Sequence, residues 1–185
     1  IERANPGMQV VECHRFEVHK GIVFDPAQGL DYTVEVDGSR VRVRSKGPHY
    51  SGTFTLAPQP LGAPELSPWE TGTGQDGSTL YTTGELFHGK VLQGISRILE
   101  SGEDRLVLEC RLPDTAVWNG AFAGRAHSPV LADLLMQGAC VLAARRIGEA
   151  CLPLSIERAE YFAPLPDDEA FVVIVDSPRP GSAGM

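Results

Sequence analysis

Apolar and polar residues alternate over short stretches in the first third of the chain, between Val10 and Leu56. Alternation with a period of two is typical of strands that have one buried and one exposed face. Four strands are predicted, at residues 10–19, 30–36, 40–44 and 50–56. The pair Asp37-Gly38 suits a tight hairpin turn between the second and the third strand. Because no stretch in this third has the period of a long helix, we expect a sheet whose apolar face has no helix of its own to cover it.

One long stretch, residues 129–148, has the pattern of a helix. Its large apolar residues recur at helical spacing: Leu131, Leu134, Leu135, Leu142 and Ile147. Ser128 suits the N-cap, Pro129 suits the first helical position, and Gly148 suits the residue at which a helix ends. Alanines, a glycine and a cysteine fill most other positions, so nearly every face is apolar. We therefore expect other structure to surround this helix.

Strands are predicted before the helix at residues 96–100 and 105–112, and after it at 154–162 and 169–176. Residues 86–95 predict a short helical or irregular segment. Residues 57–79 are rich in proline and glycine and indicate a linker between two halves of the chain. We expect residues 1–56 to be mainly strands. Residues 80–185 should form an antiparallel sheet wrapped around the helix.

Composition and charge exclude several classes of partner. The chain has 185 residues, of which 42% are hydrophobic and 22% charged, as in ordinary soluble domains. Its net charge of -8 argues against nucleic acid and against an anionic membrane. No apolar run has membrane length, and no signal segment opens the chain. Four widely spaced cysteines predict reduced thiols in a cytoplasmic protein, and the first residue, Ile1, suggests a piece of a longer polypeptide.

A carboxylate in the apolar helix is the first candidate for chemistry. Asp133 and Gln137 are four positions apart and therefore lie on one face, one turn from each other. A carboxylate among apolar residues is costly unless an interaction or a reaction uses it. One interpretation is a functional acid. The other is a structural aspartate that binds the backbone or Arg146.

Two motifs resemble those of one family. Asp133 and Gln137 match the D-x-x-x-Q motif on the helix of dehydratase domains from polyketide synthases, and residues 88–94, His-Gly-Lys-Val-Leu-Gln-Gly, match the upstream Y/H-G-P-x-F-Q-G segment. Lys90 and Leu92 depart from the usual proline and phenylalanine there. The Leu-Phe-His-Gly form is similar to that of iterative enediyne-type and polyunsaturated-fatty-acid-type synthases. The resemblance implies an α+β double hotdog, in which antiparallel sheets each wrap a long apolar helix, with the first hotdog incomplete in this chain.

The resemblance also implies a reaction and its residues. In the family, a histidine of the first hotdog removes the α-proton of a β-hydroxyacyl thioester, and an aspartic acid of the second protonates the departing hydroxyl. Asp133 matches this acid, and Gln137 is placed to orient it or the substrate. Four further residues match positions that contact substrate: His88, Gly89, Gln93 and His127. His88 could instead be a hydrogen-bonded residue at a turn, and His127 a structural residue at the helix entrance.

The family's base has no match in this sequence. Its histidine stands in an H-x-x-x-G-x-x-x-x-P motif; His14 lacks the glycine and His19 has it too early. His49, beside Tyr50, is interpreted as a surface residue. We expect the base to be encoded upstream of Ile1.

The resemblance implies partners as well. The substrate is expected on the phosphopantetheine arm of an acyl carrier protein, with no metal and no soluble cofactor. The carrier protein, its acyl chain and other synthase domains are the expected partners, and a homodimer stays open. Three alternatives within the fold also stay open. They are a product-template-like cyclase, a non-catalytic hotdog for dimerisation or carrier docking, and a hotdog thioesterase.

Overall fold

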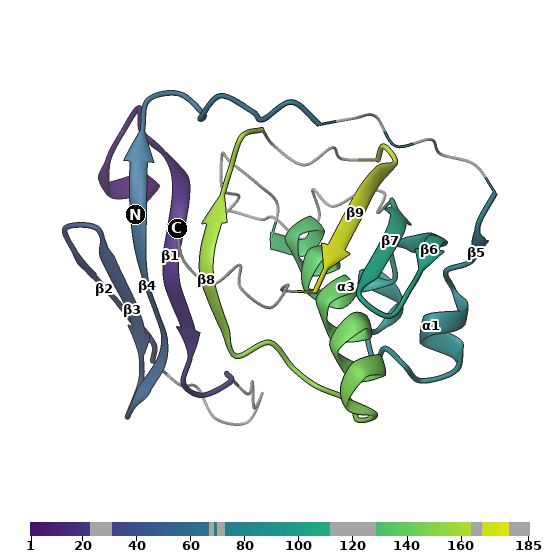
Figure 1. Ribbon diagram of the computed structural model, residues 1–185. Coiled ribbons are helices and arrows are strands. Elements are labelled where there is room, and N and C mark those ends of the chain that lie inside the picture. Colours follow the sequence, from purple (N-terminus) through teal and green to yellow (C-terminus); the bar gives the residue numbers. More distant parts are fainter. Residues whose placement is uncertain (23–30, 67–68, 70–72, 112–128, 164–167, 178–185) are drawn as a thin grey trace. The chain divides into compact units, whose positions relative to one another are not determined.

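The computed structural model describes the chain in two compact units (Figure 1). The described residues are 1–185 without 23–30, 67–68, 70–72, 112–128, 164–167 and 178–185. The first unit comprises Ile1–Pro64 and Leu154–Pro164, and the second comprises Glu65–Pro153 and Leu165–Met185. Each unit has its own antiparallel sheet.

The first unit is a five-stranded sheet with the order β2-β3-β4-β1-β8. A short 3-10 helix, η1 (Glu2–Ala4), precedes its strands, which are β1 (Gln9–Val18), β2 (Thr33–Asp37), β3 (Arg40–Arg44), β4 (Pro48–Ala57) and β8 (Ser155–Glu160). The predicted hairpin joins β2 to β3, and Gly38 in its turn has a φ of +56°, which suits glycine. The described part of this unit contains no long helix, as the pattern predicted.

The two faces of the first sheet differ in polarity. Along β3, the three arginines are exposed whereas Val41 and Val43 are half-buried. On the neighbouring β2, Val34 and Val36 remain 60% and 42% exposed. The described residues of this unit supply no long helix to cover the apolar face, which explains this exposure of valine. The described part of the first unit is thus a sheet with one charged and one apolar face.

Strand β8 belongs to a different sheet from the one expected. We expected residues 80–185 to form one half of the protein, with the strand at 154–162 in its sheet. Instead β8 pairs with β1 of the first unit, with Ala159 opposite Cys13 and Ile156 opposite Phe16. The period of two predicts a strand, but it carries no information about which edge that strand joins.

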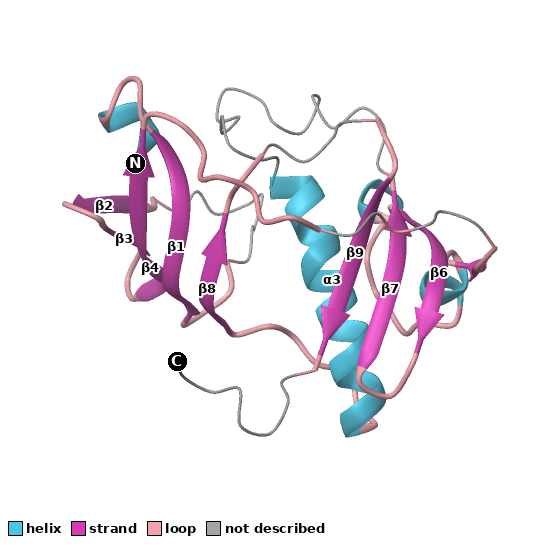
Figure 2. Cartoon of the chain, turned by 45° about the horizontal axis from the view of Figure 1, so that its top comes forward, coloured by secondary structure: helices cyan, strands magenta, loops and turns pink. Residues whose placement is uncertain are grey.

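The second unit contains a four-stranded sheet and the long helix (Figure 2). Its elements are β5 (Gln75–Asp76), α1 (Thr79–Thr82), the 3-10 helix η2 (Lys90–Leu92), β6 (Ile95–Ser101), β7 (Arg105–Cys110), α3 (Pro129–Ile147) and β9 (Phe171–Asp176). The strand order is β5-β6-β7-β9. β5 and the start of α1 lie within residues 57–79, which were predicted to be only a linker.

Helix α3 packs against β7 and β9, and their contact forms the core of the second unit. Its fully buried members include Leu134 and Val141 from the helix and Leu106 and Leu108 from β7. Gly138 lets the helix come close to the sheet, because a Cβ there would lie 3.0 Å from Cγ2 of Val175. The predicted helix and its wrapping by a sheet are both present.

The end of α3 follows the sequence prediction closely. Gly148 has a φ of +81°, and its backbone N–H donates to the carbonyl of Ala144 over 2.7 Å. A left-handed glycine of this kind satisfies carbonyl groups at a helix end. Ser128, the predicted N-cap, lies outside the described residues. None of the helices in the described part of the chain is long and apolar enough to span a membrane.

Candidate functional site

Asp133 and Gln137 of α3 are joined by a hydrogen bond. The Gln137 Nε2 amide donates to Oδ2 of Asp133 over 2.8 Å. The helical spacing of four residues places the two side chains in register for this bond, as the sequence indicated. The Asp133 side chain is 32% exposed, whereas Gln137 is 1% exposed. The carboxyl group of Asp133 is thus held by the buried amide of Gln137 while part of its surface remains accessible to solvent.

The buried amide of Gln137 has all its hydrogen-bonding groups engaged. Besides Asp133, its Nε2 donates to the backbone carbonyl of Leu92 at 2.8 Å. Its Oε1 accepts from the hydroxyl of Tyr81, also at 2.8 Å. A buried amide without these partners would be costly, and here both N–H groups and the oxygen have one. The amide therefore has one orientation that satisfies its surroundings.

Tyr81 is part of the site although sequence reasoning did not select it. It lies on the short helix α1, and its hydroxyl oxygen accepts from the backbone N–H of Ile95 at 3.2 Å. Burial raises the pKa of Tyr81 to about 12, although the Ile95 N–H acts in the opposite direction. The hydroxyl therefore keeps its proton at ordinary pH. The signal that could have identified it is general: a buried tyrosine hydroxyl usually has a partner.

His88 comes close to the same carboxyl group. Its Nε2 lies 3.5 Å from Oδ2 of Asp133, at ion-pair distance, and its side chain is 11% exposed. The ring stacks on the exposed ring of Phe87, with centroids 4.6 Å apart. Its Nδ1 is buried and has no hydrogen-bond partner among the described residues. The structure thus brings together three of the predicted site residues, namely Asp133, Gln137 and His88.

Of the remaining predicted site residues, Gly89 and Gln93 lie near His88 in the chain, and His127 is not among the described residues. Gly89 precedes η2 and is exposed; Gln93 follows it, and its Nε2 donates to the backbone carbonyl of His88 over 2.9 Å. Gln93 therefore stabilises the turn that carries His88.

The alternative role for Asp133, a structural pair with Arg146, is not the arrangement in the structure. Arg146 pairs with Asp104 at 3.6 Å, whereas the carboxyl group of Asp133 pairs with Gln137 and His88.

The three other histidines lie in the first unit. His14 is 3.4 Å from Glu12, and His19 contacts Ser51 at 2.9 Å. The interpretation of His49 as a surface residue is wrong, because it is 5% exposed. Its two ring nitrogens contact Ser45 Oγ and the carbonyl of Lys20. A polar ring can be buried in this way when both of its nitrogens have partners.

The site offers a carboxyl group for proton transfer. With Oδ2 engaged by Gln137, the other oxygen, Oδ1, has no hydrogen bond among the described residues. A half-desolvated carboxyl group of this kind can give or take a proton. No cluster of three metal-binding side chains occurs in the described part of the chain.

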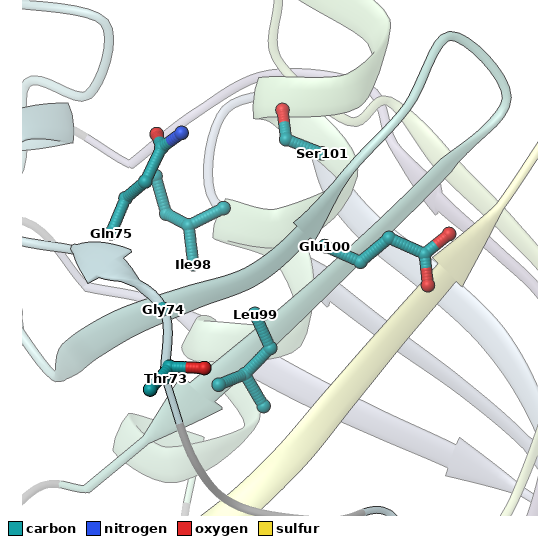
Figure 3. A pocket seen from close by; sticks show the side chains of 7 residues that line it. All are labelled: Thr73, Gly74, Gln75, Ile98, Leu99, Glu100 and Ser101. Carbon is teal, nitrogen blue, oxygen red and sulfur yellow. The ribbon is translucent and has the colours of Figure 1, made fainter.

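A pocket of about 400 Å³ lies elsewhere in the second unit, along the edge where β5 meets β6 (Figure 3). It is lined by residues 73–75 and 98–101, so it includes none of the predicted site residues. Gly74 lies against β6 there, and a Cβ at this position would be 2.6 Å from the carbonyl oxygen of Ile98. The carboxyl site and this pocket are separate features.

Comparison with solved structures identifies the fold. The chain is similar to GphF Dehydratase 1, with a TM-score of 0.61 and 17% identity over 83% of this chain and 58% of that one. It is similar to the dehydratase domain from the CurH module of Curacin polyketide synthase, with a TM-score of 0.61 and 19% identity over 91% of this chain and 65% of that one. The dehydratase domain of PpsC from Mycobacterium tuberculosis, in complex with C12:1-CoA, gives a TM-score of 0.58 and 19% identity over 88% and 61%. The chain therefore has the hotdog fold of polyketide synthase dehydratase domains, and the predicted α+β class is confirmed.

A sequence comparison adds a relative among the polyunsaturated fatty acid synthases, a type that the Leu-Phe-His-Gly form indicated. The chain is 30% identical to a subunit of the polyunsaturated fatty acid synthase from Thraustochytrium sp. (strain ATCC 26185 / S-3), over 89% of this chain. It spans 6% of that relative's length. No model of a known protein family matches the chain. The predicted resemblance to such synthases is thus confirmed.

Proposed function

We propose that the chain dehydrates a β-hydroxyacyl thioester to the α,β-unsaturated thioester, with Asp133 as the acid. The observation that carries the proposal is the Asp133 carboxyl group, held by Gln137 and flanked by His88, in the fold of dehydratase domains. The names of the similar proteins, dehydratases and a polyunsaturated fatty acid synthase subunit, support this reaction.

In the proposed mechanism, the acid works through one oxygen. Because Gln137 donates an N–H to Oδ2 of Asp133, the acidic proton belongs on Oδ1. A base takes the α-proton of the substrate, the electron pair forms the carbon–carbon double bond, and the β-carbon–oxygen bond breaks. The departing hydroxyl takes the proton of Asp133 and leaves as water. Protonation at this point matters because hydroxide is a poor leaving group.

The base is proposed to be a histidine that lies outside these 185 residues. Among the five histidines of the sequence, none stands in the H-x-x-x-G-x-x-x-x-P setting of the family's base. His88 is unsuited to the role because its Nε2 lies 3.5 Å from the acid. An acid and a base that act on neighbouring carbons of a substrate need room for it between them. We assign His88 to substrate contact and to holding Asp133.

The proposed substrate is an acyl chain on the phosphopantetheine arm of an acyl carrier protein. Support comes from the synthase context of the relatives, and other synthase domains are the proposed neighbours. The proposed chemistry is acid–base throughout and uses no metal and no soluble cofactor. The cellular location is proposed to be the cytoplasm.

The test is to incubate the full-length protein with a carrier-bound β-hydroxyacyl substrate and to follow the acyl chain by mass spectrometry. The proposal predicts loss of one water with the thioester intact. Release of a free acid would identify a thioesterase instead, and a ring formed by carbon–carbon bonding would identify a cyclase. An unchanged substrate that still binds would identify a non-catalytic carrier-docking module.

A further inference from the structure

We propose that Tyr81 is a positioning residue that fixes the amide of Gln137 so that its N–H, and not its oxygen, faces Asp133. This inference rests on the proposed function of Asp133. It assigns a role to a residue whose hydrogen bonds go to Gln137 and Ile95 and not to the reacting carboxyl group. The hydrogen-bond chain from Ile95 through Tyr81 to Gln137 carries it.

The direction of each hydrogen bond follows from the two backbone groups at the ends of the hydrogen-bond chain, one of which can only donate and the other only accept. A backbone N–H can only donate, so the Ile95 N–H must give its proton to the Tyr81 oxygen. The hydroxyl has a single proton, which it gives to Oε1 of Gln137 over 2.8 Å. The Leu92 carbonyl can only accept, so the NH₂ group of Gln137 lies on its side and Oε1 lies toward the Tyr81 hydroxyl. The NH₂ group thus faces two groups that only accept, the Leu92 carbonyl and, when ionised, the Asp133 carboxylate.

The opposite orientation of the amide would harm the acid. With Oε1 turned toward Asp133, a protonated carboxyl group could give its proton to that oxygen and withhold it from the substrate. An ionised carboxylate would instead face a second acceptor, which is unfavourable. The buried NH₂ group would then face the Tyr81 hydroxyl, and the Leu92 carbonyl would lose its donor.

Tyr81 itself is held firmly enough for this role. It follows Leu80, which is 1% exposed and belongs to the core of the second unit. The backbone of Leu80 also accepts a hydrogen bond from Leu86 over 2.8 Å, which closes the turn after α1. Because burial raises the pKa of Tyr81 to about 12, its hydroxyl stays a donor throughout the usual assay range.

The experiment compares Tyr81→Phe with wild type in the full-length protein, using the carrier-bound substrate. Phenylalanine keeps the ring and removes only the hydroxyl. We expect kcat to fall about tenfold, which equals about 1.4 kcal/mol. KM should change less than about twofold, because uniform substrate binding is untouched. Tyr50→Phe, which removes a hydroxyl in the first unit, is the matched control and should leave both constants unchanged.

A double-mutant cycle with Gln137→Ala separates positioning from a merely structural effect. If Tyr81 acts through Gln137, the double variant is no slower than Gln137→Ala alone. Additive losses, or an unchanged kcat in Tyr81→Phe, would overturn the inference while leaving the proposed function in place. If Asp133→Asn also keeps full turnover, the proposed function itself fails. Circular dichroism and melting curves confirm that each compared variant is folded.

Discussion

At the scale of single residues, the His88 ring combines a cost in stability with a place in the site. Its Nδ1 is buried without a partner among the described residues, and such a group costs about 1–3 kcal/mol in desolvation. Its Nε2 faces the carboxyl group of Asp133. A residue that lowers stability and lies beside a reactive group is typical of functional sites.

Replacing His88 by leucine should therefore separate stability from activity. Leucine has a similar volume and no polar atom, so we expect His88→Leu to keep or raise the melting temperature while it lowers the dehydration rate. Thermal unfolding followed by circular dichroism measures the first effect, and the carrier-bound substrate measures the second. A clearly lower melting temperature would show that the contacts of the ring with Asp133 and Phe87 outweigh the cost of its buried Nδ1, and would contradict this prediction.

Cysteine reactivity offers a second prediction for individual residues. Burial raises the pKa of the Cys110 thiol to about 12, and burial also raises the pKa of Cys13 and of Cys140. Because the thiolate is the reactive form, a brief treatment with iodoacetamide at mildly alkaline pH should label Cys151, which is only half-buried, well before the other three. Peptide mass spectrometry identifies the labelled site. Equal labelling of Cys110 in the native protein would contradict its burial.

Part of the site was predictable at this scale and part was not. Asp133 and Gln137 were found because helical spacing alone places them together. Tyr81 lies 56 positions from Gln137, and only the fold of the second unit brings them into contact. The burial of His49 likewise depends on Lys20, which is 29 positions away. Local patterns do not encode such distant partners.

At the scale of elements, the backbone of Gly77, just after β5, lies very close to the backbone of β6. A Cβ at this position would lie 2.6 Å from the carbonyl oxygen of Ile95. The backbone N–H of Gly77 also donates to the carbonyl of Ser96 over 3.0 Å. The glycine thus lets the segment that carries α1 and Tyr81 lie against the edge of the sheet.

We therefore expect Gly77→Ala to destabilise the protein by about 1–3 kcal/mol, because the obstructing atom is backbone and cannot rotate away. The free energy of unfolding in urea measures this change. Gly62→Ala is the control, since nothing lies within 4 Å of a Cβ there, and it should have little effect. Equal stability of the two variants would show that the edge can adjust.

Long helices and strands could be predicted from the pattern of apolar residues, whereas very short ones could not. Helix α3 has 19 residues and a glycine at its end, so its period and its limit were both readable. β5 has two residues and α1 has four, which is too short for any period to be seen. Both lie in or next to a stretch whose prolines and glycines suggested a linker.

At the scale of the whole molecule, the chain leaves the first unit after Pro64 and returns to it at Leu154. β8 then completes the first sheet and β9 the second, so each unit depends on a strand from the last part of the chain. The sequence predicted both strands. It did not predict this division between sheets, because pairing across more than a hundred residues depends on packing and not on local pattern.

The proposed reaction depends above all on Asp133, which is to donate the proton that lets water leave. The decisive experiment measures the rate of water loss from a carrier-bound β-hydroxyacyl chain by full-length Asp133→Asn, beside Asp104→Asn, which alters a 77% exposed aspartate of the same unit. General acid catalysis contributes about 10²–10⁴-fold, so we expect at least about a hundredfold loss in Asp133→Asn and none in Asp104→Asn. Wild-type turnover by folded Asp133→Asn would remove this carboxyl group from the reaction and refute its role as the acid.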